Sequence, residues 1–214
     1  MSAVAPDLPM PRSSDPSLTL VLATRNPGKV AELAAALEGL PVTLVSAAEV
    51  GAPEVEEDAG TLRGNAEKKA RALHAHTGLP ALADDTGLEV DALDGAPGVF
   101  SSRYAGPEGD DAANRRKLLA DLAGAPARTA RFRTVLAFAD GAGVRFFDGV
   151  CEGVIAAEEA GAGGFGYDAL FRPSEGDGRT FAEMTAAEKN RISHRGRAVE
   201  AFAAFLQDYL RPPQ

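Results

Sequence analysis

The stretch LTLVLATRNPGK, residues 18–29, is the strongest indication of the fold class. Its first six residues form a short, mostly apolar run, which predicts a buried strand. Asn26 can then cap a helix, and Pro27 suits the first helical position because its missing N–H needs no partner there. Helical spacing predicts one buried face for this helix, made by Val30, Leu33, Ala34 and Leu37. A strand that leads directly into a helix is typical of α/β proteins.

The rest of the chain mixes extended and helical patterns in the same way. We expect strands at 42–45, 79–83 and 88–93, and helices at 110–122 and around 199–206. Thr61 can cap a further helix, in which Lys69 borders an apolar stripe and Lys68 points further out; the stripe is made by Leu62, Ala66, Ala70 and Leu73. Thr185 and Glu188 match a capping box, which marks one more helix start. Residues 131–155 hold two strand-like runs on either side of the turn DGAG, residues 140–143, which predicts a long β-hairpin. Together these elements predict an α/β fold around a mixed, twisted β-sheet.

Length and composition limit the class of protein. The 214 residues are 45% hydrophobic and 25% charged, which fits one domain over 18–210 after a proline-rich, disordered extension at 1–17. The formal net charge of -9 argues against a nucleic-acid partner but allows a small anionic ligand, because local cations dominate at close range. No apolar run is long enough for a membrane span, and no secretory signal is present, so we expect no membrane partner. A lone cysteine, Cys151, fits a cytoplasmic location and a structural role in a strand.

Two adjacent carboxylates, Asp84 and Asp85, follow the apolar run at 79–83. Carboxylates at the end of a buried strand are costly to desolvate unless a metal ion or a lysine offsets their charge. Mg²⁺ takes one or two carboxylates and completes its shell with water and substrate phosphates, and Glu57 is a candidate second ligand. One carboxylate could instead orient or deprotonate a water molecule. A turn is the alternative for the aspartate pair, and a charged helix start is the alternative for the acidic stretch 54–58.

Cationic groups lie in two other segments. The turn from Thr24 to Lys29 joins a strand to a helix, where free backbone N–H groups and the helix dipole favour a phosphate. A well-capped helix with a solvated lysine explains the same residues. Lys69 borders the buried face of the next helix and could reach into a cleft. The sequence is equally consistent with a side chain whose apolar stem lies along the helix and whose charged end is in solvent.

Aromatic and basic residues form a third group of candidates. Phe165 to Asp168 follow a glycine-rich run, and such an aromatic can cover a nucleobase or instead pack into the core. His194 and Arg195 begin the last helix, where they could donate to a carbonyl or phosphate oxygen or simply be solvated.

Six short stretches, taken in order, resemble one known family, the non-canonical purine nucleoside triphosphate pyrophosphatases, also called inosine triphosphate or dITP/XTP pyrophosphatases. The stretches are LATRNPGK (22–29), NAEKKA (65–70), ADDTGL (83–88), GAPG with SRY (95–98 and 102–104), GGFGYD (163–168) and EKNRISHR (188–195). Each stretch alone is a weak signal, whereas six in the family's order are specific. Two features depart from the family: Arg25 stands where many relatives carry glycine, and the residues before Leu18 have no counterpart.

The resemblance implies an elongated two-lobed fold with an active-site cleft between the lobes, and a homodimer. It implies Mg²⁺-dependent hydrolysis of ITP, dITP and XTP between the α- and β-phosphates, which gives the nucleoside monophosphate and pyrophosphate. Rival functions are a pyrophosphatase for other modified or pyrimidine nucleotides and a non-enzymatic nucleotide sensor. The implied site comprises Asp85 and Lys69 as catalytic residues, Glu57 and Asp85 as metal ligands, and as substrate contacts Thr24, Arg25, Asn26, Pro27, Gly28, Lys29, Thr86, Phe165, Gly166, Tyr167, Asp168, Lys189, His194 and Arg195.

Overall fold

A computed structural model describes residues 17–24 and 27–211 of the chain. The predicted extension therefore lies outside the described residues, apart from Ser17. Two predicted substrate contacts, Arg25 and Asn26, also lie outside them. Pro27 begins the first helix, and only its backbone is described.

Strands and helices follow one another in the mixed order that the sequence predicts. The strands are β1 (Leu18–Leu22), β2 (Val42–Ser46), β3 (Ala81–Val90), β4 (Pro97–Gly98), β5 (Thr129–Asp140), β6 (Gly143–Ile155) and β7 (Phe171–Pro173). The helices are α1 (Pro27–Ala36), α2 (Leu62–Thr77), α3 (Asp111–Asp121), α4 (Ala186–Ile192) and α5 (His194–Tyr209). Short 3₁₀ helices η1 (Asp91–Leu93), η2 (Ser101–Arg103) and η3 (Phe181–Glu183) complete the set. The α/β fold class is therefore confirmed.

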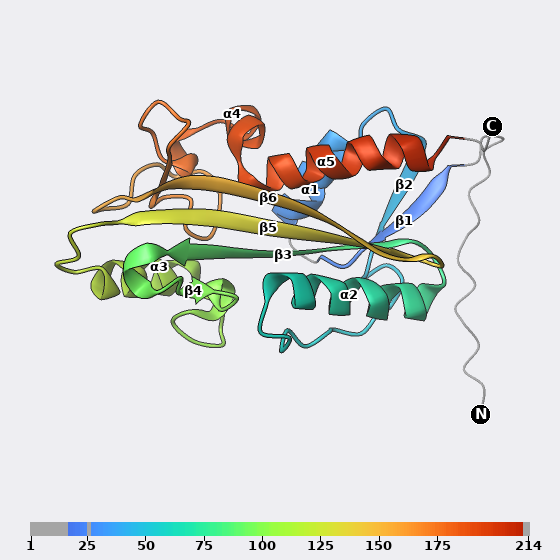
Figure 1. Ribbon diagram of the computed structural model, residues 1–214, viewed down its shortest axis with the longest axis horizontal. Helices are drawn as coiled ribbons and strands as arrows, with labels where there is room; N and C mark the ends of the chain where they lie inside the picture. The colour runs from blue at the N-terminus through green and yellow to red at the C-terminus, as the bar shows by residue number, and fades with distance from the viewer. Residues whose placement is uncertain (1–16, 25–26, 212–214) are drawn as a thin grey trace. The chain divides into compact units, whose positions relative to one another are not determined.

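All the described strands belong to a single mixed sheet. Its order is β2-β1-β3-β5-β6-β7, and β4 pairs with β3 at one side of this path. β1 runs parallel to both β2 and β3, whereas β4 is antiparallel to β3 and β7 is antiparallel to β6. The long β5–β6 hairpin is confirmed (Figure 1). Its turn is closed by Asp140, whose Oδ1 accepts from the backbone N–H groups of Ala142 and Gly143.

β3 corrects the sequence prediction at the aspartate pair. We expected one strand to end before Asp84 and another to begin at Leu88, but a single strand runs from Ala81 to Val90. The strand has partners on both sides: β5 is its neighbour in the sheet order, and on the other side β1 pairs at Ala81 and Leu82 while β4 pairs at Leu88 and Glu89. Lysine contacts described below offset the charge of Asp84, so the carboxylate does not interrupt the ladder.

The described residues divide into two compact units. Unit 1 holds the chain up to Asp84 together with Leu136–Phe147 and the residues from Val199 onward. Unit 2 holds Asp85–Val135 and Asp148–Ala198. The boundary on β3 thus falls between the two aspartates.

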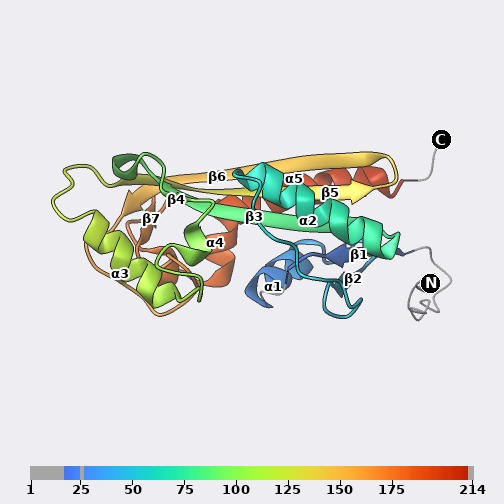
Figure 2. The same cartoon turned by 90° about the horizontal axis from the view of Figure 1, so that it is seen from below.

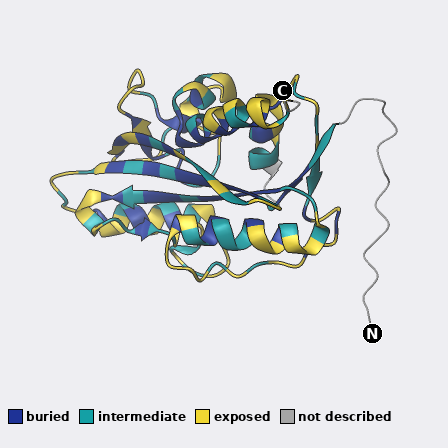
Figure 3. Cartoon of the chain, turned by 45° about the vertical axis from the view of Figure 1, so that its right-hand side comes forward, coloured by how far each residue is buried: buried dark blue, intermediate teal, exposed yellow. Residues whose placement is uncertain are grey.

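In unit 1, helix α1 lies beside strands β1 and β2 in both cartoon views (Figure 1, Figure 2). The predicted stripe of α2 is confirmed, because Leu62, Ala66, Ala70 and Leu73 are buried while the opposite face is exposed (Figure 3). Thr61 caps this helix as expected, since its side chain accepts from the N–H of Gly64. The buried face of α1 is narrower than predicted: Leu33 and Leu37, the residue just after the helix, are buried, whereas Val30 is half-buried and Ala34 is exposed.

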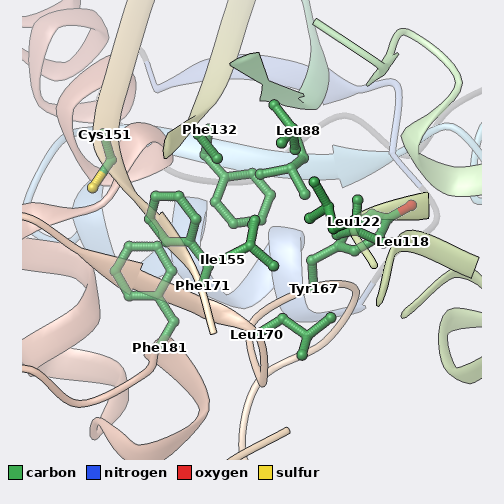
Figure 4. Close-up of a cluster of buried hydrophobic side chains, with 12 residues drawn as sticks. Leu88, Leu118, Leu122, Phe132, Cys151, Ile155, Tyr167, Leu170, Phe171 and Phe181 are labelled. Atoms are coloured by element: carbon green, nitrogen blue, oxygen red, sulfur yellow. The ribbon is translucent and has the colours of Figure 1, made fainter. Parts of the chain in front are cut away.

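Unit 2 has an aromatic core of its own (Figure 4). Phe132 contacts Phe171 edge to face, with ring centroids 4.7 Å apart, and Phe181 stacks on Phe132 at 6.2 Å. Cys151 lies in this core, where burial raises the pKa of its thiol to about 11, so the thiol stays protonated at neutral pH. This agrees with a structural role for the cysteine. None of the helices in the described part of the chain is long and apolar enough to cross a membrane.

Candidate functional site

Unit 1 contains a cavity of about 240 Å³ beside the carboxyl end of β1. Polar side chains from four segments face it: Thr24 after β1, Lys29 on α1, Glu57 before α2 and Lys69 on α2. Asp84 of β3 completes this polar group, and the remaining wall is made by Ala23, Ala47, Ala52, Pro53, Glu54, Val55, Ala72 and Leu73. The structure thus brings together residues that are as much as 60 positions apart in the sequence.

Two lysines and two carboxylates form close ion pairs in this cavity. Lys29 Nζ lies 2.6 Å from Asp84 Oδ2, and Lys69 Nζ lies 2.6 Å from Glu57 Oε1. Lys69 also donates to the backbone carbonyl of Asp84 at 2.6 Å. The Asp84 side chain is only 4% exposed and that of Lys69 only 12%, so little water screens these charges. Ammonium groups of this kind can bind phosphate oxygens, and the carboxylates can bind a hard cation.

Lys69 and Lys68 differ as their positions on α2 predict. Lys69 borders the buried face of the helix and reaches into the cavity, whereas the Lys68 side chain is 39% exposed and pairs with Asp58. Burial of the long side chain of Lys69 along the helix leaves its charged end at the polar cluster.

Asp85 begins unit 2 and is 7% exposed. Side chains of consecutive strand residues point to opposite faces, so Asp84 and Asp85 have different surroundings although both are buried. The neighbouring Thr86 is half-buried, and its hydroxyl lies 2.7 Å from the hydroxyl of Thr134 on β5. Arg195 Nη2 donates to Thr86 Oγ1 at 3.4 Å. Two of the predicted substrate contacts, Thr86 and Arg195, therefore touch each other within unit 2.

Phe165 lies at the centre of the other predicted contacts in unit 2. Lys189 Nζ is 4.8 Å from the centroid of the Phe165 ring, and Arg195 Cζ is 5.4 Å from it, both within range of a cation–π interaction. The backbone N–H of Phe165 donates to Asp168 Oδ2 at 2.9 Å. The ring itself is partly exposed, so its contacts leave some of its surface open to a ligand.

Asp168 and Lys189 form a buried ion pair beneath this ring. Lys189 Nζ lies 2.7 Å from Asp168 Oδ2, and the two side chains are 8% and 5% exposed. His194 is buried as well, with its ring stacked on Phe132 at 4.5 Å and an interplanar angle of 16°. Next to it, Gly149 of β6 packs directly under the start of α5, where a Cβ atom would overlap the carbonyl oxygen of His194.

Tyr167 lies differently from its neighbours in the GGFGYD stretch. Its side chain belongs to the unit 2 core, and its hydroxyl donates to the carbonyl of Ser101 at 2.8 Å. Burial raises its pKa, so the phenol is a neutral hydrogen-bond donor. The side chain thus fixes the loop from below, and a substrate contact at this position would fall to the backbone.

The chain matches the Ham1 family over residues 20–205, which is most of its length and includes the glycine-rich run 161–166. This chain belongs to the Ham1 family. A Ham1 relative from Geobacter sulfurreducens, named dITP/XTP pyrophosphatase, is 52% identical over 195 residues, which are 89% of this chain and 96% of the relative. The resemblance inferred from the six stretches is therefore confirmed.

Solved structures agree with the Ham1 assignment. A HAM1 protein from Coxiella burnetii is 43% identical, has a TM-score of 0.84 and covers 89% of this chain and 99% of its own. A nucleoside-triphosphatase, or dITP/XTP pyrophosphatase, from Mycobacterium abscessus is 46% identical with a TM-score of 0.71, and covers 88% of this chain and 99% of its own. The Ham1 match includes every described residue of the predicted site.

Sequence reasoning missed three polar residues that contact the candidate site residues Thr86 and Gly166. Thr134 is fully buried in β5 and contacts Thr86; a hydroxyl at the strand position between Phe132 and Leu136 on the same face was the available signal. Asp111 and Arg115 of α3 both contact Gly166, and their spacing of four residues places them on one helix face. Across the described residues, no group of three or more His, Cys, Asp or Glu side chains forms a metal cluster.

The start of α4, which carries Lys189, allows a pH prediction. Thr185 and Glu188 form the predicted capping box, and Arg179 Nη2 donates to Glu188 Oε1 at 2.8 Å. The Arg179 contact, with the capping bonds, lowers the pKa of Glu188 from 4.5 to about 2. Because the folded-state pKa is lowered, Glu188 stabilises the fold above its ordinary pKa, and the stabilisation is lost as the pH falls towards about 2.

We therefore expect Glu188→Gln to lower the urea midpoint at neutral pH, with a difference from wild type that shrinks between about pH 5 and about pH 2. Glutamine keeps an acceptor for the cap but does not titrate. Urea unfolding followed by circular dichroism at several pH values measures this difference. A difference that stays constant across the range contradicts the role of the Glu188 charge.

Proposed function

We propose that this Ham1 chain hydrolyses ITP, dITP and XTP to the nucleoside monophosphate and pyrophosphate, with Mg²⁺ as cofactor. The observation that carries the proposal is the cavity of unit 1, where Lys29 and Lys69 meet Glu57 and Asp84. Cations and carboxylates together suit a triphosphate and its metal ion better than either charge alone. The names of relatives about 50% identical to the chain support the same substrates.

In the proposed reaction a water molecule attacks the α-phosphorus. The bond between that phosphorus and the oxygen that bridges to the β-phosphate breaks, and pyrophosphate leaves with the electron pair. Asp85 accepts the proton of the attacking water, a role that suits a buried carboxylate. Lys69 stabilises the charge that develops on the phosphate oxygens, and Lys29 with the turn from Thr24 binds the triphosphate.

The metal ligands proposed are Glu57 and Asp85. Their carboxylate oxygens match the preference of Mg²⁺, and two protein ligands agree with a metal that keeps water and phosphate in its shell. When bound, Mg²⁺ supplies positive charge that lowers the repulsion between the phosphates and an approaching nucleophile. The protein residues bind the nucleotide, orient the water and hold its proton.

We assign the purine base to the residues of unit 2. Phe165 would stack on the base, and Asp168, Lys189, His194 and Arg195 would provide the polar surroundings. Hypoxanthine and xanthine carry an oxygen at position 6, whereas adenine carries an amino group there. A buried donor such as Arg195 can pair with that oxygen. With adenine the same donor would face the donating amino group, and leaving a buried donor without an acceptor is strongly unfavourable.

One assay tests the proposal directly. Pyrophosphate release is measured for ITP, dITP, XTP, GTP, ATP and a pyrimidine triphosphate, with Mg²⁺ or with EDTA. We expect kcat/KM for ITP and XTP to exceed that for ATP by about 100-fold or more, because one unmatched buried donor discriminates to that degree. EDTA should abolish release, and added Mg²⁺ should restore it.

The other outcomes of this assay decide between the rival functions. Preferred release from the pyrimidine triphosphate would support a pyrophosphatase for other nucleotides. Binding of ITP without release would support a sensor and contradict hydrolysis. Chromatography of the products shows which bond breaks, since a nucleoside diphosphate product would exclude cleavage between the α- and β-phosphates.

We also propose a homodimer that works in the cytoplasm. The family resemblance supports the dimer, and the single buried cysteine is compatible with a reducing compartment. Sedimentation equilibrium of the full chain measures the dimer directly, and a monomer at micromolar concentration would contradict it.

A further inference from the structure

The glycine-rich loop of unit 2, residues 161–166, needs external contacts to hold one conformation. Four of its six residues are glycine, and Gly161, Gly164 and Gly166 have positive φ values of 83°, 71° and 60°. Glycine loses more backbone freedom on ordering than any other residue, so a loop of this composition is costly to fix. The loop also carries Phe165, whose ring contacts Lys189 and Arg195. Whatever fixes the loop therefore also places this ring.

Helix α3 binds both polar groups of one loop residue. The backbone N–H of Gly166 donates to Asp111 Oδ2 at 2.7 Å, and Arg115 Nη1 donates to the Gly166 carbonyl at 2.8 Å. Asp111 and Arg115 are four residues apart, so they project from the same face of the helix. We call this arrangement, Asp111 and Arg115 on Gly166, the Gly166 clamp.

The clamp is itself held in place. Arg115 Nε lies 2.9 Å from Glu159 Oε2, so a second carboxylate helps to orient the guanidinium. The Arg115 side chain is 19% exposed, and its hydrogen bond to the Gly166 carbonyl is charge-assisted, while its contact with Glu159 is an ion pair. The same segments enclose a polar cavity of about 210 Å³ lined by Asp111, Arg115, Glu159, Asp168, Ala169 and the loop.

The clamp lies one residue from the ring that the proposed function assigns to the base. Gly166 follows Phe165 directly, and on its other side the Phe165 N–H is held by Asp168. The two residues thus have three backbone groups bound by side chains from outside the loop. Losing the two bonds to Gly166 would free the peptide that follows the ring while the rest of the fold stays unchanged.

We propose that Asp111 and Arg115 are positioning residues that set the affinity of this enzyme for the base of its substrate by ordering Phe165. This inference rests on the proposed function, because it assumes that Phe165 contacts the base. It predicts a change in KM with little change in kcat, since neither residue belongs to the cavity of unit 1 in which the triphosphate is placed.

The test compares Asp111→Ala with Asp111→Asn. Alanine removes the acceptor for the Gly166 N–H, whereas asparagine keeps an oxygen in the same position. We expect Asp111→Ala to raise KM for ITP about tenfold with kcat within about twofold, and Asp111→Asn to stay near wild type. Arg115→Ala should act like Asp111→Ala, and Arg116→Ala, at the next and exposed position of α3, is the control. An unchanged KM in Asp111→Ala, or an equal rise in Asp111→Asn, overturns the inference.

Hydrogen–deuterium exchange gives a readout that does not depend on activity. In Asp111→Ala, the peptide that contains residues 161–168 should take up deuterium faster than in wild type, while the peptides of β5 and β6 are unchanged. Unchanged uptake in the loop overturns the clamp. If the wild-type chain releases no pyrophosphate from any nucleotide, the proposed function fails by itself, and the exchange measurement still decides whether Asp111 orders the loop.

Discussion

Replacing Asp85 with asparagine is expected to lower kcat for ITP by about 10² to 10⁴-fold, the range that a general base contributes. Asparagine has nearly the same shape, but it can neither take a proton from water nor offer a charged oxygen to Mg²⁺. The nucleotide should still bind, because the residues assigned to the base and to the triphosphate are unchanged and Asp85 is buried on β3. Steady-state kinetics gives kcat, and calorimetry with ITP in the presence of Mg²⁺ gives the affinity.

Asp84→Asn is the matched control for this variant. The two aspartates are adjacent and similarly buried, but the carboxylate of Asp84 pairs with Lys29 in the cavity of unit 1. We expect Asp84→Asn to weaken nucleotide binding and to lower kcat less than Asp85→Asn does. The assignment is wrong if Asp85→Asn keeps near wild-type turnover. If Asp84→Asn instead lowers kcat more than Asp85→Asn does, Asp84 is the catalytic residue.

The second large effect concerns stability. Lys189→Met should lower the free energy of unfolding by about 3–5 kcal/mol, because it leaves the buried carboxylate of Asp168 without its cation. Methionine fills a similar volume, so the loss reflects charge rather than a cavity. Urea unfolding at neutral pH measures it. Lys117→Met removes an exposed ion pair with Asp121 and should cost no more than about 1 kcal/mol.

A double variant separates the ion pair from other roles of Lys189. In Asp168→Asn with Lys189→Met, neither member of the ion pair is charged, and the asparagine oxygen can still accept from the Phe165 N–H. The double variant should therefore be more stable than Lys189→Met alone. If the double variant is no more stable than Lys189→Met, the loss comes from the cation–π contacts of Lys189 with Phe165 and Phe181, not from the unpaired carboxylate.

Local patterns predicted most of the elements. The stripe of α2, the caps at Thr61 and Thr185 and the β5–β6 hairpin each depend on residues only a few positions apart, and each is confirmed. The same logic explains the error at Ala34. Helical spacing shows which residues share a face, but the width of the buried face depends on what packs against the helix.

Contacts between distant residues could not be predicted in this way. The aspartate pair reads as the end of a strand because its charge is costly to bury, and the compensating Lys29 and Lys69 lie on two other elements. Likewise, the contact between Thr134 and Thr86 joins residues 48 positions apart, and the Gly166 clamp joins residues 55 and 51 positions apart. The six family stretches predicted the candidate site residues, whereas the contacts that hold them came only from the structure.

The absent side chain of Gly149 has a consequence for the basic residues at the start of α5. The helix can approach β6 so closely only because nothing projects from the strand at that position. Any larger residue would push the His194 backbone outward and would carry the guanidinium of Arg195 with it. The position of the Arg195 guanidinium thus depends on the absence of a Cβ atom at Gly149, which lies 45 residues before His194 in the chain.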